Sequence, residues 1–421
     1  KRTKSIRLKL LRIWKDTRLL LKPVVILSGL GYLVDAFDIM TFSVVRTASL
    51  KSLGLEGDAL TSAGMMIVNL QMGGMIIGGI VWGVLGDKLG RLKIMLASIM
   101  IYSVANIGNG FAVGVPDYAV WRFMAGFGLA GEIGAAVTIV SESLPRTKRG
   151  LGVMVIVSCA AMGGLLAGFI GQIVPWRVAY VIGGVAGLVL LALRISVKES
   201  KIFEHMVHDR KIERGNAWMI LSRGHLLRAY IRCLLIGVPV WYIIGILVTL
   251  SPEFAKENGV SGVVTAGTAV SLSFGAALIG EYVCGILSQL WQSRRKALIV
   301  FMGVGTFVIG GFFTLPLTTS TQFYIYIAML GFIFGYWVTF NTTIAEQFGT
   351  NLRATVATSI PNLVRGSVIP LNMMMAWLHQ TMGYTYHQSG LYLGIGVMSV
   401  ALIALWFTPE TFHRDLEFVE K

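Results

Sequence analysis

Residues 61–93 read TSAGMMIVNLQMGGMIIGGIVWGVLGDKLGRLK, and this stretch contains the pattern that decides the fold. Its first part, residues 61–85, is apolar almost throughout, whereas residues 86–93 carry three basic side chains and one acid. About 20 consecutive apolar residues are enough for a helix to cross the hydrocarbon core of a bilayer. The stretch therefore predicts a transmembrane helix that ends in a short basic loop.

The same alternation of apolar runs and short polar segments continues along the whole chain. Of the 421 residues, 55% are hydrophobic and only 14% are charged, whereas about 25% are charged in a typical soluble protein. The sequence thus predicts an all-α integral membrane protein with twelve transmembrane helices. We expect these helices at roughly residues 23–46, 61–85, 94–114, 117–140, 150–173, 177–197, 228–250, 264–291, 297–316, 321–345, 354–378 and 389–408.

The positions of Lys and Arg predict how the helices cross the membrane. Most of the 36 basic residues lie in loops on one side, and only Arg46, Lys51, Arg177 and Lys256 lie in loops on the other. Because basic loops stay in the cytoplasm, we expect both termini to be cytoplasmic and the membrane to be a bacterial inner membrane. The basic residues follow the membrane topology and form no single soluble face, which excludes nucleic acid as a partner.

The chain is predicted to divide into two six-helix halves. Glu142 is followed seven residues later by Arg149, and Glu346 is followed seven residues later by Arg353, so the same pair recurs after 204 residues. Two parallel halves, each built from inverted three-helix units, are a known transporter architecture. We expect a basic amphipathic cytoplasmic segment at 1–22 that lies on lipid headgroups and is not a signal peptide, an N-terminal half at 23–197, a cytoplasmic loop at 198–227, a C-terminal half at 228–408 and a cytoplasmic tail at 409–421.

The loop after the second predicted helix carries a motif. The segment GVLGDKLGRLK has the spacing GxxxD(R/K)xGR(R/K), with its key residues at Gly83, Asp87, Gly90 and Arg91. This spacing resembles the loop signature of the major facilitator superfamily. The resemblance implies close helix packing at Gly83, a tight turn at Gly90, and an Asp87 that accepts from a helix end or pairs with a basic group. The matching loop of the second half has Gln289 in place of the acid. We therefore expect the charged contacts that hold the cytoplasmic side closed, here called the latch, to depend mainly on the first half.

Two further motifs narrow the resemblance to one branch. The fourth predicted helix contains the pattern Arg122-x3-Gly126-x-Gly128-x2-Gly131-Glu132, and the tail contains Pro409-Glu410-Thr411. These motifs, together with the loop that follows the first, are similar to signatures shared by sugar porters and related metabolite symporters. The seventh helix lacks the paired glutamines of sugar porters, which makes a sugar substrate less expected. The branch implies coupling to protons and no cofactor.

Acids inside the predicted helices are the candidates for proton coupling. Asp35 and Asp38 lie on one face of the first helix, because residues three apart share a face, and they resemble the first-helix DGxD motif of aromatic-acid:proton symporters. Glu132 lies near mid-depth in the fourth helix. Inserting an ionisable side chain at this depth of the membrane costs at least about 2.5–3.5 kcal/mol of free energy, and such a residue usually marks a functional site. The alternative is a buried acid that only forms hydrogen bonds between helices.

Polar and aromatic residues in other helices are the candidates for substrate binding. Arg365 lies near the middle of the eleventh helix, where its guanidinium suits a carboxylate; the alternative is a permanent ion pair with one of the acids. Glu281 either pairs with Arg365 or joins the latch, and the aromatics either line a cavity or pack. The candidate set is Arg365, Asn362, Arg122, Glu281, Gln71, Trp241, Tyr242, Tyr336, Trp337 and Asn341.

Together these features predict a secondary active transporter, in which protons and a small, carboxylate-bearing metabolite move together. The predicted cytoplasmic gate consists of Gly83, Asp87, Gly90, Arg91, Glu142, Arg149, Glu346 and Arg353, with ion pairs between its acids and arginines formed within or between these loops. Uptake of a cation, proton antiport of a metabolite or drug, and a sensor that no longer transports are the alternatives. No catalytic or metal-ligand pattern is visible, and we expect a monomer whose partners are the bilayer, protons and the substrate.

Overall fold

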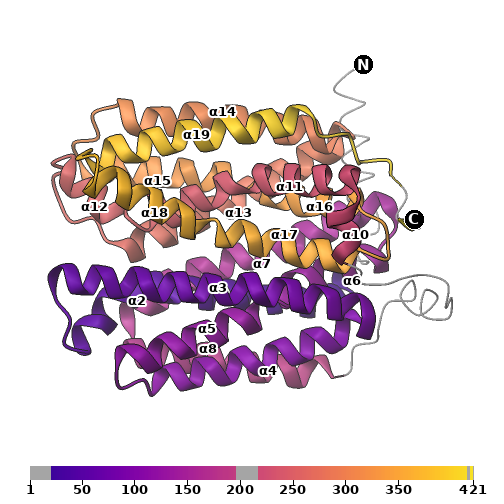
Figure 1. Cartoon of the computed structure of the whole chain (residues 1–421), viewed down its shortest axis with the longest axis horizontal. Coiled ribbons are helices and arrows are strands. Elements are labelled where there is room, and N and C mark those ends of the chain that lie inside the picture. The colour runs from indigo at the N-terminus through magenta and orange to yellow at the C-terminus, as the bar shows by residue number, and fades with distance from the viewer. Residues whose placement is uncertain (1–19, 196–216, 415–417, 421) are drawn as a thin grey trace.

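The computed structural model describes residues 20–195, 217–414 and 418–420, and within them the protein is a bundle of helices that run along one common direction (Figure 1). In the first part of the chain these are α2 (Pro23–Ser52), α3 (Gly57–Leu89), α4 (Arg91–Gly110), α5 (Val115–Leu129), α6 (Glu132–Ser143), α7 (Arg146–Ile173) and α8 (Trp176–Arg194). In the second part they are α10 (Ala217–Ser222), α11 (Gly224–Tyr242), the π-helix η2 (Ile243–Val248), α12 (Ser251–Glu257), α13 (Ala266–Leu290), α14 (Arg294–Thr314), α15 (Ser320–Phe334), α16 (Trp337–Gln347), α17 (Arg353–Gly366), α18 (Val368–Gln380) and α19 (Tyr386–Trp406). The predicted segment 1–22 and the predicted loop 198–227 lie largely outside the described residues.

Eleven helices of the described chain are long and apolar enough to cross a membrane, one fewer than the sequence predicts. The difference is the eleventh predicted helix, which is divided into α17 and α18. The break falls at Ser367, after Gly366, whereas Pro361 lies inside α17 without ending it. Two short helices in sequence therefore take the place of one uninterrupted span.

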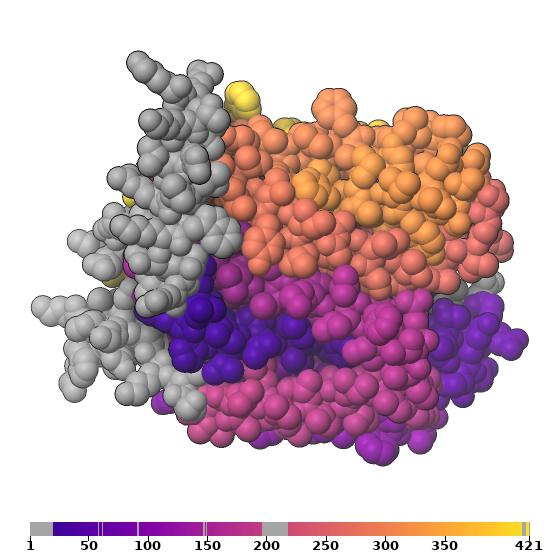
Figure 2. Space-filling view, turned by 180° about the vertical axis from the view of Figure 1, so that it is seen from behind, coloured from indigo at the N-terminus to yellow at the C-terminus, as the bar shows by residue number. Residues whose placement is uncertain are grey.

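The helices gather into two groups along the chain. Helices α2 to α8 lie together in the lower part of Figure 1, and α11 to α19 lie above them. The rear view in Figure 2 shows the indigo-to-magenta and the salmon-to-orange groups meeting along one seam. Across this seam α7 packs against α13, and α3 packs against α17. We call the two groups the first and second halves.

Close approach of the halves depends on small residues, as is usual where helices associate without a strong hydrophobic drive. A Cβ atom at Gly83 of α3 would lie 3.0 Å from both Cα and O of Thr355 in α17. Any larger side chain at this position would push the two helices apart. The glycine of the loop motif thus has a packing role at the seam.

The fourth and tenth predicted helices are both interrupted near their middle. The first breaks at Ala130 and Gly131, between α5 and α6, and the second breaks at Gly335 and Tyr336, between α15 and α16. The interruptions are 205 residues apart, within one residue of the 204-residue period of the Glu–Arg pairs. They make Glu132 the first residue of α6 and Trp337 the first residue of α16.

The two ends of the bundle differ in charge. The end that holds Lys88, Arg294, Arg295, Lys296 and the C-terminal residues is here called the basic end. The end with the α2–α3 connection and α12 is called the opposite end (Figure 1). The distribution of basic residues predicts that the basic end is cytoplasmic.

Candidate functional site

A cavity lies between the two halves, about midway along the bundle. Its volume is about 40 Å³, and its walls come from α2, α7, α11, η2, α13, α15, α16 and α17. Most of the lining side chains are apolar, and two carry groups that can be charged, Arg365 and Glu281. The aromatic side chains of the lining are Tyr32, Trp241, Phe274, Phe334 and Trp337. A mostly apolar cavity with a few polar groups is the usual form of a small-molecule site.

Arg365 of α17 is held at the cavity by residues of both halves. Its Nη2 donates to Asp35 Oδ2 at 3.0 Å and to Tyr32 Oη at 3.2 Å, and its Nη1 donates to Asn362 Oδ1 at 3.3 Å. Trp337 Nε1 also donates to Tyr32 Oη at 3.0 Å. Asp35 and Tyr32 belong to the first half, so this network joins the halves across the cavity.

The second predicted acid, Asp38, is paired away from the cavity. Arg122 Nη1 donates to Asp38 Oδ1 at 3.2 Å, and Arg122 Nη2 makes a short hydrogen bond to Asn106. The Arg122 guanidinium also lies 4.4 Å from the centre of the Tyr180 ring. This cluster belongs entirely to the first half, and Arg122 does not line the cavity.

The third predicted acid, Glu132, has a partner that sequence reasoning missed. Arg194 of α8 donates to both carboxylate oxygens, with Nη1 to Oε2 at 2.7 Å and Nη2 to Oε1 at 2.6 Å. Arg194 also donates to the carbonyl oxygen of Leu27. A Cβ atom at Gly31 would lie 2.7 Å from Arg194 Cζ, so the pair needs a glycine beside it.

Glu281 differs from these three acids. It is 3% exposed, and its Oε2 has no hydrogen-bond partner. Among the described residues it forms no ion pair, so the expected pairing with Arg365 is absent and the alternative role in the latch has no contact to support it. The structure places it in the cavity wall instead.

A second cavity, also of about 40 Å³, lies nearer the opposite end. Ile39, Met40, Trp241 and Ile244 line both cavities, so they form a thin apolar layer between them. Gln71 faces this second cavity rather than the central one. Beyond it, Arg46 donates to Glu253 across the halves at 3.4 Å.

Three predicted lining residues face elsewhere. Tyr242 Oη donates to the carbonyl oxygen of Gly390 at 2.6 Å, and Tyr336 Oη donates to that of Ile236 at 2.7 Å. Asn341 donates to the Trp337 carbonyl at 2.8 Å within its own helix. These three side chains stabilise contacts of the second half and do not line the central cavity.

The basic end of the bundle is closed. Asp87, at the end of α3, accepts from the backbone N–H groups of Ala354 at 3.1 Å and Thr355 at 2.8 Å, and from the Thr355 hydroxyl at 2.6 Å. These donors are the first residues of α17, where a carboxylate is stabilised by free N–H groups and the helix dipole. Gly90 follows with φ 106°, a value that favours glycine. A side chain of the first half thus caps a helix of the second.

The repeated Glu–Arg motifs contribute ion pairs at the basic end. Arg353 donates to Glu142 at 3.2 Å, which joins the second half to the first. Glu346 accepts from Arg294 at 2.9 and 3.2 Å, within the second half. The chain distance of seven residues puts each acid and arginine on different helices, and packing of the halves selects the partner. The side chains of Arg91 and Arg149 lie outside the described residues.

The comparison with known proteins decides the family. The sequence profile described as the Major Facilitator Superfamily matches residues 29–370. The chain belongs to the major facilitator superfamily. As a member, it is an integral multi-pass membrane protein and a secondary transporter of small metabolites, not an enzyme.

Several curated members of the superfamily align with this chain. The putative niacin/nicotinamide transporter NiaP of Bacillus subtilis (strain 168) is 26% identical over 78% of this chain and 81% of its own length. The niacin transporter NiaP of Acinetobacter baylyi is 25% identical over 93% of this chain and 94% of its own. The inner membrane metabolite transport protein YhjE of Escherichia coli K12 is 23% identical over 93% and 95%.

A solved structure shares the fold. The proton:xylose symporter XylE superposes with a TM-score of 0.73 at 18% identity, over 94% of this chain and 97% of that chain. At this level of identity the likeness concerns the fold alone. Among the described residues of this superfamily member, no group of three or more His, Cys, Asp or Glu is placed to hold a metal ion.

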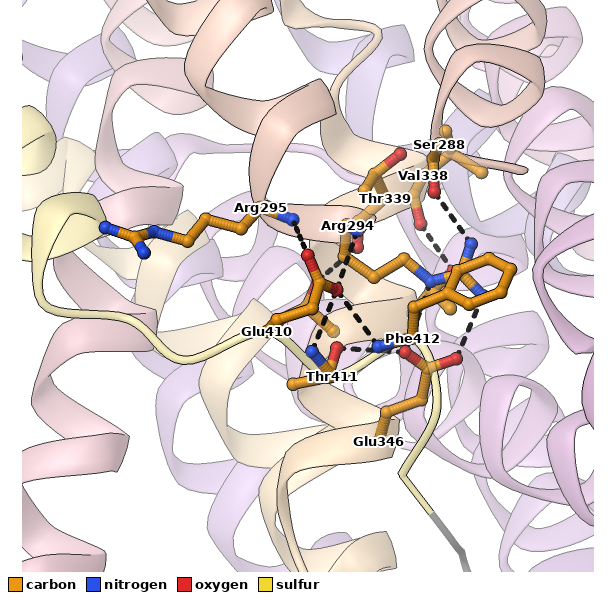
Figure 3. Close-up of polar contacts among 11 residues, drawn as sticks. Ser288, Arg294, Arg295, Val338, Thr339, Glu346, Glu410, Thr411 and Phe412 are labelled. Atoms are coloured by element: carbon orange, nitrogen blue, oxygen red, sulfur yellow. Dashed lines mark hydrogen bonds and ion pairs between the residues drawn. The ribbon is translucent and has the colours of Figure 1, made fainter. Parts of the chain in front are cut away.

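The C-terminal residues of this transporter fasten the basic end of the second half (Figure 3). Glu410 accepts from the N–H groups of Arg294, Thr411 and Phe412 at 2.9–3.0 Å, and Ser293 makes a short hydrogen bond to it. Burial alone would raise the pKa of the Glu410 carboxyl, but these hydrogen bonds outweigh burial and hold the pKa below its usual range. The tail motif Pro409-Glu410-Thr411 thus has a structural role that its sequence alone does not reveal.

Proposed function

We propose that this transporter moves a small carboxylate with a flat ring together with a proton. The observation that carries the proposal is the position of Arg365. It is the cation that lines the central cavity, it is held by one carboxylate from the other half, and the Trp241 and Trp337 rings line the same cavity. A guanidinium binds a carboxylate through paired hydrogen bonds, and aromatic rings prefer to pack against another ring.

Competition for Arg365 supplies a route to proton coupling. A substrate carboxylate that binds the guanidinium takes the place of Asp35, which then remains buried without a cation. A buried carboxylate without a partner is far less stable than the neutral acid, so Asp35 takes up a proton as the substrate binds. One proton then accompanies one monoanion, and the loaded cavity has the same net charge as the empty one.

Of the three predicted coupling acids, Asp35 fits this role best. Asp38 and Glu132 are paired with Arg122 and Arg194 inside the first half, away from the cavity lining. Only Asp35 pairs with an arginine of the second half. Movement of one half against the other changes this pair directly and leaves the other two intact.

Alternating access needs a barrier at each end of the cavity. At the basic end the barrier consists of the Asp87 cap on α17 and the Glu142–Arg353 pair. Toward the opposite end it is the layer of Ile39, Met40, Trp241 and Ile244. The names of relatives agree with the proposed substrate class, since the chain resembles niacin transporters and a benzoate transport protein.

Thermal stabilisation of the purified protein tests the substrate class. The panel contains nicotinate, its uncharged amide nicotinamide, the saturated acid cyclohexanecarboxylate and the cation N-methylnicotinamide, each at pH 5.5 and 7.5. A ligand at 100 times its Kd stabilises the folded protein by about 2.7 kcal/mol. We expect nicotinate to stabilise most, and more at pH 5.5 because binding takes up a proton. Stabilisation by the cation alone would contradict the proposal and assign the site to the carboxylates.

A further inference from the structure

Glu281 is the one feature of the central cavity that the proposed mechanism leaves unused. It lies on α13, where that helix packs closely against the break between α15 and α16: a Cβ atom at Gly335 would lie 2.5 Å from the Glu281 backbone nitrogen. This contact fixes the backbone at Glu281 and directs the residue to the cavity wall. Ser158 and Cys159 of α7 lie beside the carboxyl, on the first half.

The carboxyl of Glu281 has no cation to balance it. Asp35, Asp38 and Glu132 each pair with an arginine, whereas no described basic residue pairs with Glu281. Taking an unpaired carboxylate out of water costs far more than taking out the neutral acid. Among the described residues, Cys159 of α7 and Cys284 of α13 are titratable groups beside Glu281, and Tyr32 and Arg365 line the same cavity. Arg365 already has a carboxylate partner.

We propose that Glu281 is a specificity residue that stays a neutral carboxylic acid and donates its proton, in a hydrogen bond, to an acceptor atom on the substrate ring. This inference rests on the proposed function and names the substrate class more closely. Arg365 and Glu281 come from different walls of the cavity, with aromatic side chains in the same lining. Such a site recognises a flat heteroaromatic ring with a carboxylate at one edge and a ring nitrogen or carbonyl elsewhere.

An unsatisfied polar atom in the cavity wall would also disfavour a ring that has no acceptor atom. The Ser158 hydroxyl lies beside the Glu281 carboxyl, but among the described residues Oε2 makes no hydrogen bond. A ring with an acceptor atom satisfies this group, whereas a ring with only C–H leaves it unsatisfied, and a site of this kind discriminates against the second ligand. The residue therefore acts on the choice between ligands and not on the carboxylate itself.

Nicotinate and benzoate are the matched probes, because they differ only by a ring nitrogen in place of a C–H. We expect the wild-type protein to bind nicotinate about 2- to 12-fold more tightly than benzoate, since a neutral hydrogen bond contributes about 0.5–1.5 kcal/mol. Glu281→Gln keeps a neutral donor and should keep the preference. Glu281→Leu removes the donor and should bring the Kd ratio to about one, with benzoate affinity unchanged or improved. Calorimetric titration of detergent-solubilised protein measures all three ratios.

Two readouts guard against a purely structural effect. Glu281→Leu should unfold at a higher temperature than wild type, because it replaces an unsatisfied buried polar group by an apolar one. The infrared difference spectrum between wild type and Glu281→Leu should show the carbonyl band of a protonated acid. A carboxylate band, or an unchanged nicotinate preference in Glu281→Leu, overturns the inference. If wild type binds neither nicotinate nor benzoate, the proposed function fails; if it binds both equally, only this inference fails.

Discussion

Arg365 of α17 donates a hydrogen bond to Asp35 of α2 across the interface between the two halves, with 3.0 Å between Nη2 and Oδ2. Both side chains are almost completely buried. A buried ion pair of this kind contributes little net stability, but loss of one partner leaves an uncompensated charge. A substrate carboxylate can replace Asp35 at Arg365 only if Asp35 is neutralised, and this links substrate binding to a proton.

Substitution of Arg365 tests the anion site. Arg365→Lys keeps the charge but loses the planar fork, and loss of a charge-assisted hydrogen bond of about 1.5–3 kcal/mol should weaken the Kd for nicotinate about 10- to 150-fold. Arg365→Ala should abolish binding. Arg122→Lys is the matched control, because Arg122 is equally buried but pairs with Asp38 away from the cavity. Calorimetry on folded protein gives these constants, and unchanged affinity in Arg365→Lys would place the anion site elsewhere.

Removing the charge of Asp87 should loosen the basic end. Asp87→Asn weakens the cap on α17. Loss of a helix cap lowers the free energy of unfolding by about 0.5–2 kcal/mol. In a background without the native cysteines, Thr358→Cys on buried α17 should react faster with a maleimide when Asp87→Asn is present. Lys88→Gln changes the neighbouring exposed residue and should leave the labelling rate as it is. Equal rates in all three proteins would mean that the cap does not hold the end closed.

The Glu142–Arg353 pair predicts rescue by exchange of charges. Either Glu142→Gln or Arg353→Gln leaves one buried charge without its main partner, which costs about 3–5 kcal/mol. The double variant Glu142→Arg with Arg353→Glu should recover part of the lost thermal stability, because it restores an ion pair across the halves. A double-mutant cycle from thermal unfolding measures the coupling. Strictly additive effects would show that the two residues act independently.

Glu410 predicts an effect of pH on the C-terminal residues. Because its pKa is lowered in the folded protein, its contribution to stability is fully present above its ordinary value of about 4.3 and is lost as the pH falls through the lowered value. The protection of the Thr411 and Phe412 amides, taken as the exchange rate relative to the intrinsic rate at the same pH, should therefore fall below about pH 4. In Glu410→Gln the protection should already be lower at pH 7 and should vary less with pH. A wild-type protection that changes between pH 7 and 5 instead would assign the effect to another group.

Much of the fold could be predicted because membrane helices are marked by long apolar runs. Eleven of the twelve expected helices appear with the expected order. The eleventh does not appear as one apolar span because α17 is polar, with Thr355, Thr358, Ser359, Asn362 and Arg365 along it. The break follows Gly366, whereas Pro361 lies inside α17. The sequence contains the breaker residues but not the position at which tertiary contacts use them.

The site was less predictable, because its contacts join residues far apart in the chain. Asp35 and Arg365 could be proposed as partners from their depth, but Arg194 is close to a helix end and reads as one more basic residue of a loop. Its pairing with Glu132 appears only when α8 is packed against α4 and α2, both of which also pack against α6. Tyr32 was missed for a similar reason, since a tyrosine in an apolar run carries no signal until Arg365 and Trp337 are placed at its hydroxyl.

Uptake of radiolabelled nicotinate into proteoliposomes under an imposed pH gradient, acid outside, tests the central claim most directly. Wild-type protein should accumulate nicotinate above its external concentration, and collapse of the gradient should release it. Asp35→Asn should still exchange nicotinate across the membrane but should not accumulate it, because the empty carrier would have to move with Arg365 uncompensated. Wild-type uptake that ignores the pH gradient, or full accumulation by Asp35→Asn, would contradict the account.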